Sequence, residues 1–429
     1  MLRLAAPLAL AELGWMAMGF VDIVMAGRLG PAAIGAGSLG NMLFFPIAIC
    51  GTGALMGLDT LVAQAFGARN HQDCRHSLIN GLWLTIAIAP MTAAALWGTL
   101  TIVRATGTNA VVMRLLVPYV KALLWGIFPL LCFTAFRRYL QAMNIARPVT
   151  FAVVSANLVN FAGNWLLMFG HWGAPRMGLE GSGWSTSIAR FYIALVLLAA
   201  VVWNERKAGF LLFQVERRPD FTRIRRLLGL GVPSALQILI EGAVFTVVTV
   251  MAARLDEMSL AAHSIAMSVV STTYMVPLGI SSAAAVRVGQ AIGRKDPRGA
   301  ATSGWTALLL GAVFMGSAGL ALAIVPRWIL RFYTADAAII STGVTLLRLA
   351  ALFQLFDGFQ VVAMGALRGL GDTRSPMLAH FLGYWAIGMP VSYLLCFRYA
   401  WGASGIWAGL SAALILIGVA LVVVWARRS

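Results

Sequence analysis

Five acidic residues of this 429-residue sequence lie inside long apolar runs, where a carboxylate is costly to place. The run GWMAMGFVDIVMAGRLG, residues 14–30, is long enough to lie within a bilayer and carries Asp22 near its middle. A charged side chain at the bilayer centre costs about 2.5 to 3.5 kcal/mol on insertion scales. Such residues usually face a bundle interior or a hydrated cavity and mark ion or substrate pathways. The five acids are Glu12, Asp22, Asp59, Glu241 and Asp357.

Glu241 and Asp357 lack a cation nearby on their own predicted helices. Glu241 is followed by apolar residues as far as Arg254, and Asp357 lies more than two turns after Arg348. Each is followed directly by glycine. If both face one cavity, the pair could bind a cationic substrate in alternation with a proton or Na⁺. This is the chemistry of an antiporter, and it predicts that any bound Na⁺ is held at Glu241 and Asp357.

Asp22 has candidate partners in the stretch NLVNFAGNW, residues 157–165. Asn160 and Asn164 are four residues apart, so they share one face of a helix. Asparagines in membrane helices either line a polar pathway or hold helices together by hydrogen bonds, and both interpretations stay open here. We predict that Asp22 borders a polar cavity with these asparagines as partners.

The other two acids favour different interpretations. We expect a structural role for Asp59 at a helix end, whereas Glu12 either lines the cavity or pairs with a basic side chain. The basic residues inside predicted spans and away from their ends, and therefore the candidate partners, are Lys121, Arg190 and Arg348.

The composition explains why these acids are exceptional. The chain is 60% hydrophobic and 11% charged, with a mean hydropathy of +0.85, which is typical of an integral membrane protein. We predict an all-α polytopic protein with twelve transmembrane helices. The segments are 3–27, 33–66, 77–103, 112–136, 149–170, 182–203, 227–253, 258–286, 300–325, 340–366, 376–397 and 402–425.

The basic residues predict the orientation of these helices. With both termini in the cytoplasm, most of the 32 lysine and arginine residues fall in cytoplasmic loops and tails, as the positive-inside rule requires. We therefore expect a multi-pass protein of the cytoplasmic membrane whose basic surface faces anionic lipid headgroups and does not bind nucleic acid.

The two halves of the chain match each other at a constant offset. Residues 62–70, VAQAFGARN, fall on residues 288–296, VGQAIGRKD, at an offset of 226, and Pro7 falls on Pro233. The matches predict two parallel six-helix repeats, an arrangement that transporters use to rock two bundles about a central site. The predicted parts are an N-terminal lobe at 1–203, a basic cytoplasmic linker at 204–226 and a C-terminal lobe at 227–429.

Signals of enzymes are missing from the sequence. GAGSLG at 35–40 fits a dinucleotide-binding fingerprint but follows no predicted strand, and no HExxH, GxSxG or Walker A motif occurs. The four cysteines are scattered and predict neither disulfides nor a metal site. We expect no enzymatic activity and no cofactor other than a coupling ion.

The motifs GFVDIVMAGRLG, GLDTLVAQAFGA, VGQAIGRKD and LRGLGDTRSP, in this order, resemble the NorM-type bacterial branch of the multidrug and toxic compound extrusion (MATE) family. The resemblance runs from Leu4 to Trp425. It implies two six-helix lobes around a V-shaped central cavity and export of cationic aromatic compounds, hence multidrug efflux, coupled to inward flow of Na⁺ or protons.

The resemblance also implies site residues. The family's helix-1 aspartate is matched by Asp22, its helix-5 asparagines by Asn160 and Asn164, its helix-7 glutamate by Glu241 and its helix-10 aspartate by Asp357. NorM-type relatives often have a tyrosine one turn before the helix-10 aspartate, where this chain has Phe353. Gln354 and backbone carbonyls would then supply oxygen ligands beside Phe353 in the cavity wall.

Three questions stay open at this point. The coupling ion is Na⁺ or H⁺, and its site lies in either lobe. The substrate is an organic cation or another small molecule, and the alternative is a flippase or exporter of a lipid-linked or metabolite substrate in the same superfamily. We expect a monomer in the lipid bilayer.

Overall fold

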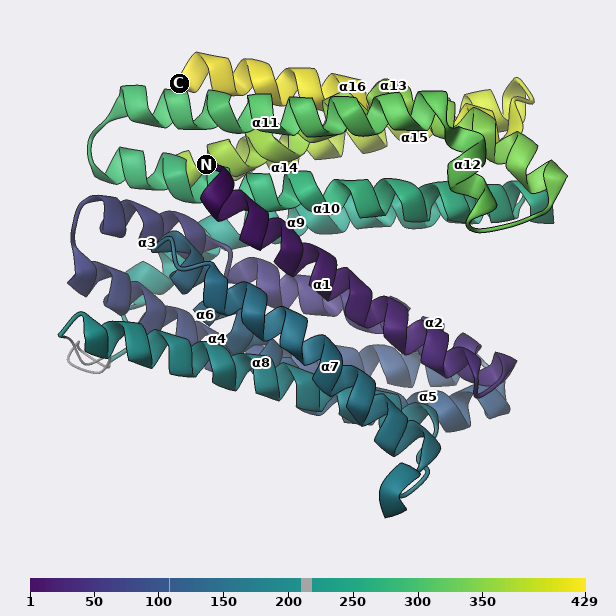
Figure 1. The fold of residues 1–429 in the computed structure, drawn as a ribbon, viewed down its shortest axis with the longest axis horizontal. Helices are drawn as coiled ribbons and strands as arrows, with labels where there is room; N and C mark the ends of the chain where they lie inside the picture. Colours follow the sequence, from purple (N-terminus) through teal and green to yellow (C-terminus); the bar gives the residue numbers. More distant parts are fainter. Residues whose placement is uncertain (108, 210–217) are drawn as a thin grey trace. The chain divides into compact units, whose positions relative to one another are not determined.

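The computed structural model describes residues 1–107, 109–209 and 218–429, and within these ranges it is helical throughout its regular structure (Figure 1). Eleven helical segments are long and apolar enough to cross a membrane. The pair α5 and α6, bent by 42° at Gly126, makes a twelfth span if it is counted as one. The predicted all-α fold with twelve spans is therefore confirmed, and several helices extend beyond the predicted apolar segments because their polar ends continue the same helix.

The helices before the central loop are α1 (Leu2–Gly27), α2 (Pro31–Ala54), α3 (Gly57–Gly67), α4 (His71–Ala105), α5 (Ala110–Trp125), α6 (Ile127–Ala142), α7 (Arg147–Phe169), the 3₁₀ turn η1 (His171–Gly173) and α8 (Leu179–Lys207). After it come α9 (Phe221–Ala253), α10 (Glu257–Gly293), α11 (Pro297–Ile324), α12 (Pro326–Arg331), α13 (Ala337–Leu370), α14 (Arg374–His380), the π-helical turn η2 (Phe381–Gly388), α15 (Met389–Tyr393), a second π-helical turn η3 (Leu394–Arg398) and α16 (Gly402–Arg428).

The chain forms two compact units. The N-terminal unit is Leu10–Ala235, and the C-terminal unit is Leu236–Ser429 together with Met1–Ala9. The boundaries after Ala9 and after Ala235 lie 226 residues apart, which is the offset of the sequence repeat. The first boundary lies inside α1 and the second inside α9. The chain therefore passes from one unit to the other at equivalent positions of the two repeats.

Glycines at equivalent positions make the packing at these boundaries possible. A Cβ atom on Gly53 would lie 2.5 Å from Cβ of Ala235, and a Cβ on Gly279 would lie 2.5 Å from the backbone N of Ala9. Gly53 and Gly279 are again 226 residues apart. Small residues let helices approach closely where the bilayer supplies no hydrophobic driving force, and here the repeat preserves such a contact in both units.

The predicted division into an N-terminal lobe at 1–203, a linker at 204–226 and a C-terminal lobe at 227–429 stays a prediction. Part of the predicted linker, residues 210–217, lies outside the described residues.

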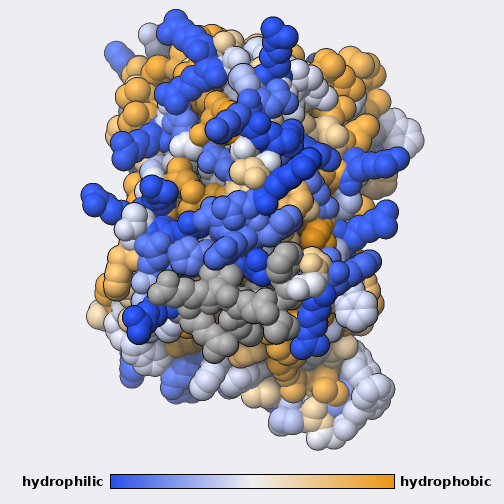
Figure 2. Space-filling model, turned by 90° about the vertical axis from the view of Figure 1, so that its left-hand side faces the viewer, coloured by the Kyte–Doolittle hydropathy of each residue, from blue (hydrophilic) through white to orange (hydrophobic). Residues whose placement is uncertain are grey.

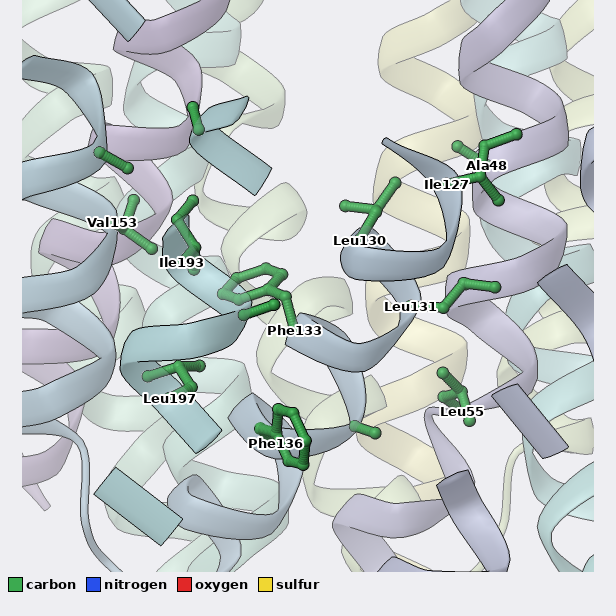
Figure 3. Close-up of a cluster of buried hydrophobic side chains, with 14 of the residues drawn as sticks. Ala48, Leu55, Ile127, Leu130, Leu131, Phe133, Phe136, Val153, Ile193 and Leu197 are labelled. Carbon is green, nitrogen blue, oxygen red and sulfur yellow. The ribbon is translucent and has the colours of Figure 1, made fainter. Parts of the chain in front are cut away.

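The helix α6 lies at the centre of the N-terminal unit. Figure 3 shows Leu130 and Leu131 on the side toward Leu55 and Ala48, whereas Phe133 lies toward the residues of α7 and α8. All of these side chains are buried. Because α6 buries both faces, polar groups on it must also find partners inside the protein.

Two adjacent arginines of α6 are paired in this way. Arg137 forms a salt bridge with Glu12 of α1, and Arg138 lies 2.9 Å from Asp59 of α3. Both arginines lie in the last two turns of α6, which continues to Ala142. The salt bridges agree with the predicted pairing of Glu12 with a basic side chain and with the structural role expected of Asp59.

Charged side chains of the C-terminal unit gather at one end of its helices. The C terminus and the loop between α10 and α11, with Arg294 and Lys295, lie on one side in Figure 1. Figure 2 faces that side and shows hydrophilic side chains clustered there. Arg428 reaches Asp372 in this region at 2.7 Å. Which side of the membrane this end faces stays a prediction of the positive-inside rule.

We expect Gly53→Leu and Gly279→Leu each to destabilise the protein strongly, because their Cβ atoms have no room. Gly316→Leu is the control, since a Cβ there would meet nothing within 4 Å. Thermal unfolding in detergent measures the effect. Equal melting temperatures for all three variants would contradict the packing described.

We expect Asp59→Asn to destabilise the protein by about 3 to 5 kcal/mol, because it leaves the Arg138 guanidinium buried without its anion. Arg428→Gln is the control: its side chain is 51% exposed, so loss of its pair with Asp372 should change little. Denaturation of the purified variants in detergent measures both effects. The account fails if Arg428→Gln lowers the free energy of unfolding as much as Asp59→Asn does.

Candidate functional site

Asp22 is hydrogen bonded to two other helices of the N-terminal unit. The amide of Asn164 on α7 donates to its Oδ1 at 2.6 Å, and the hydroxyl of Thr186 on α8 donates to its Oδ2 at 3.1 Å. Asn164 also reaches Oδ1 of Asn160 at 3.3 Å. We call Asp22, Asn160, Asn164 and Thr186 the N-terminal polar cluster. Its hydrogen bonds join α1, α7 and α8.

Close packing of α7 on α8 positions this cluster. A Cβ atom on Gly163 would lie 2.5 Å from Oγ of Ser185, so only glycine allows this approach. The Ser185 hydroxyl then donates to the carbonyl of Asn160 at 2.7 Å. Both asparagines are fully buried. The bond from Ser185 fixes the backbone of α7 at Asn160 against α8.

A small cavity of about 20 Å³ borders Asp22. Its polar lining includes Asn41 and Tyr119 besides two serines, Ser38 and Ser182. A cavity of this size holds about one water molecule. The cavity beside Asp22 is therefore about the size of one bridging water in this structure.

The second group of polar residues lies in the C-terminal unit, around Glu241 of α9 and Asp357 of α13. The amide of Gln360 donates to Oδ1 of Asp357 at 2.9 Å and reaches the hydroxyl of Tyr384 at 3.4 Å. Oε2 of Glu241 lies 3.9 Å from Nε2 of His380. We call Glu241, Asp357, Gln360, His380 and Tyr384 the C-terminal acid cluster.

The orientation of His380 follows from its hydrogen bonds. Its Nδ1 lies 2.8 Å from the carbonyl oxygen of Pro376, which can only accept, so Nδ1 carries the hydrogen. In neutral imidazole Nε2 is then an acceptor, and the amide of Gln237 lies 3.4 Å from it. His380 thus presents an acceptor nitrogen toward Glu241.

The helix that carries His380 and Tyr384 is irregular. It changes from α14 to the π-helical turn η2 directly after His380. A Cβ atom on Gly383 would lie 2.3 Å from Ile417, so this turn packs very closely on α16. Single π-helical turns in α-helices occur frequently at functional sites, and this one positions Tyr384 beside Gln360.

Glu241 and Asp357 lie in the same unit, and two ionised carboxylates close to each other would repel. Among the residues that the structure describes, no lysine or arginine lies within 4.0 Å of either. A cation bound at the pair would relieve this repulsion. The oxygen Oε1 of Gln360 is buried and has no hydrogen-bond partner among the residues that the structure describes. Carboxylate and amide oxygens are the ligands that a hard cation such as Na⁺ prefers.

The structure brings together the residues that the sequence selected within each unit: Asp22 with Asn160 and Asn164, and Glu241 with Asp357. Phe353 stacks on Trp407 with ring centres 6.1 Å apart, and the Gln354 amide donates to Thr273. Both side chains are buried, and Oε1 of Gln354 lacks a hydrogen-bond partner among the described residues.

Sequence reasoning missed four polar residues of the clusters: Thr186, Gln360, His380 and Tyr384. Glutamine three residues after Asp357 and histidine four residues before tyrosine in an apolar span were available signals. Neither signal alone predicts a functional role, because such polar residues also hold helices together by hydrogen bonds. Of the basic residues proposed as partners, Lys121 lies 5.7 Å over the Trp97 ring, whereas Arg190 acts on Asp22.

Comparison with known proteins agrees with the motifs. The sequence profile of the MatE family matches residues 7–166 and 233–394, once in each half of the chain. The chain is 36% identical to "Probable multidrug resistance protein NorM" of Mesorhizobium japonicum, covering 100% of this chain and 93% of the relative. It is 37% identical to "Multidrug resistance protein NorM" of Burkholderia vietnamiensis, covering 99% and 92%.

Solved structures show the same fold at lower identity. One, titled "Crystal structure of MATE in complex with MaL6", superposes with a TM-score of 0.92 at 16% identity and covers 100% of this chain and 95% of that one. The two profile matches and the full-length relatives together confirm the predicted family. The chain belongs to the MatE family, the multidrug and toxic compound extrusion family that its motifs resemble.

Proposed function

We propose that the protein is a secondary active antiporter that exports organic cations or other xenobiotics in exchange for Na⁺ or H⁺. The observation that carries the proposal is the pair Glu241 and Asp357, of which Asp357 is buried and Glu241 partly exposed, and which has no lysine or arginine partner among the described residues. This pair lies in a chain that is similar over its full length to proteins named for multidrug resistance.

Mutually exclusive binding at the acid pair explains exchange. Two carboxylates that repel each other favour binding of one cation, either a coupling ion or a cationic substrate. Once one is bound, the net negative charge that attracts the other is reduced. If the site faces opposite sides of the membrane in turn, the inward gradient of the ion drives the substrate out.

Both coupling ions are compatible with the residues present. Na⁺ would use the oxygens of Glu241 and Asp357 with an amide oxygen of Gln354 or Gln360, which takes the place of the hydroxyl that Phe353 lacks. A proton needs only one carboxylate and an acceptor. Asp22 with Asn160 and Asn164 is a second candidate for coupling, in the N-terminal unit.

Aromatic and sulfur-containing residues suit a cationic aromatic substrate. The chain has 22 Phe, 14 Trp and 19 Met, and aromatic faces attract cations. We propose that the protein acts as a monomer in the cytoplasmic membrane with both termini in the cytoplasm. One chain suffices because each polar cluster is complete within it.

The other functions considered have less support. A flippase or exporter of a lipid-linked substrate is not favoured, because the relatives are named for multidrug resistance. An enzyme would require a nucleophile or metal site, and family membership argues for a transporter. A channel would equilibrate its substrate and would not accumulate it.

The first test uses everted membrane vesicles, in which export appears as accumulation of a fluorescent organic cation in the lumen. An outward Na⁺ gradient and an outward proton gradient are imposed separately. We expect one of the two gradients to drive accumulation in the wild type. Glu241→Gln and Asp357→Asn should each abolish accumulation, because each removes one of the two carboxylates that bind the cation. Normal accumulation in both variants would contradict the proposed site.

A second test concerns Tyr384, whose hydroxyl supports Gln360 and through it Asp357. We expect Tyr384→Phe to reduce accumulation roughly two- to tenfold, the effect of losing one hydrogen bond. Tyr393→Phe is the control, since Tyr393 lies nearby along the chain but is 57% exposed. Equal rates in the two variants, at equal amounts of folded protein, would show that Tyr384 does not position the acid cluster.

A further inference from the structure

His263 of α10 lies at the centre of a chain of hydrogen bonds inside the C-terminal unit, and its side chain is buried. The indole Nε1–H of Trp407 on α16 donates to Nδ1 of His263 at 3.1 Å. The other ring nitrogen, Nε2, lies 3.1 Å from the hydroxyl oxygen of Thr249 on α9. The Thr249 hydroxyl in turn donates to the carbonyl of Phe245 at 2.8 Å. These bonds join three helices of the unit.

Each hydrogen in this chain has a defined position. An indole N–H can only donate, so Nδ1 of His263 accepts. The hydrogen of a neutral imidazole then lies on Nε2, which donates to Oγ1 of Thr249. His380, whose Nδ1 carries the hydrogen, has the opposite tautomer. His263 is therefore a neutral imidazole that uses both nitrogens to hold neighbouring helices.

On the α13 side this chain of contacts reaches to within one turn of Asp357. Phe353 precedes Asp357 by four residues and stacks on Trp407, with ring centres 6.1 Å apart. Both rings are buried, so they pack as part of the interior of the unit. Because the bond to His263 holds the Trp407 indole, it also holds the turn of α13 that precedes Asp357.

On the α9 side the chain ends one turn from Glu241. Phe245 follows Glu241 by four residues, and its carbonyl accepts the bond from Thr249. The Phe245 ring also lies edge-on to Tyr384 of the C-terminal acid cluster, with ring centres 6.2 Å apart. A shift of α9 relative to α10 would break the bond between Thr249 and His263 and would disturb this edge contact.

We infer that His263 is a positioning residue for the acid pair. By joining α9 to α16, and through Trp407 to α13, it fixes the separation at which Glu241 and Asp357 bind one cation. This inference rests on the proposed antiport, because the pair has a separation to keep only if it binds a cation. Binding groups have to be held within about 0.5 Å of their productive positions, and the contacts of His263 hold both helices one turn from the acids.

The test separates affinity from stability. His263→Phe removes both hydrogen bonds of the imidazole and leaves the Trp407 N–H buried without its acceptor, so this variant should melt at a lower temperature. Adding Trp407→Phe removes that N–H and keeps an aromatic ring against Phe353, so the double variant should recover part of the melting temperature. Neither variant restores the link between α9 and α13.

Accumulation of a fluorescent organic cation in everted vesicles supplies the second readout. The quantity compared is the concentration of the driving ion, Na⁺ or H⁺, that gives half-maximal accumulation at equal amounts of folded protein. We expect His263→Phe and the double variant each to raise it about two- to tenfold, the effect of one hydrogen bond on an affinity. A bond that only stabilised the fold would change the melting temperature and leave this concentration as it is.

Ser392→Ala is the matched control, because Ser392 is fully buried and joins α15 to α16 of the same unit by donating to the carbonyl of Ile406 at 3.0 Å. It should leave the half-maximal concentration unchanged. The inference is overturned if this concentration returns to the wild-type value in the double variant together with the melting temperature. It is equally overturned if Ser392→Ala raises the concentration as much as His263→Phe does.

A spectroscopic measurement tests the hydrogen bonds by themselves. In ¹⁵N NMR of the purified protein labelled in its five histidines, the signal lost in His263→Phe should be that of a neutral ring with its hydrogen on Nε2. A hydrogen on Nδ1 would exclude the bond from Trp407 and overturn the inference.

Failure of the inference and failure of the proposed function give different results. If the wild type accumulates no cation under either gradient, the proposed antiport fails, and the role of His263 at the acid pair fails with it. If the wild type accumulates the cation and both His263 variants keep its half-maximal concentration, the inference alone is overturned.

Discussion

A carboxylate inside a membrane-spanning helix must be compensated within the protein or by something that binds to it. The chain meets this constraint in three ways. Asp59 is paired directly with Arg138. Asp22 accepts hydrogen bonds from Asn164 and Thr186. Glu241 and Asp357 have neutral partners, Gln360 and His380, but no lysine or arginine within 4.0 Å among the described residues. The direct ion pair of Asp59 stabilises the fold, whereas two acids without a cation supplied by the protein leave a demand for one that the proposed transport uses.

The two halves of the repeat share close helix packing, but the acids of one half have no acidic counterpart in the other. The contact of Gly53 with Ala235 recurs as that of Gly279 with Ala9. At the same offset of 226, however, Glu241 corresponds to Trp15, which stacks on Phe133, and Asp22 corresponds to Val248. Close helix packing depends on small residues that both halves keep. The chemistry depends on single polar positions, so it differs between the halves without disturbing the architecture.

Much of this organisation could be predicted from the sequence. Apolar runs define the spans because a helix must cover the hydrocarbon thickness, and isolated acids such as Glu241 stand out against them. The partners could not be predicted where they depend on distant helices. Arg138 pairs with Asp59, 79 residues away, and His380 meets Glu241 from another helix. A count of charges along the chain cannot show such pairs, since they arise only when helices pack.

The central claim is that the substrate cation and the coupling ion compete for one acid pair. The most direct measurement is the affinity of the purified protein for a fluorescent aromatic monocation, determined while the Na⁺ concentration and the pH are varied separately. Because binding of competing ligands is linked, the account predicts that the dissociation constant rises about tenfold for each tenfold rise in one of the two ions once that ion saturates its site. A dissociation constant that responds to neither ion would contradict the account.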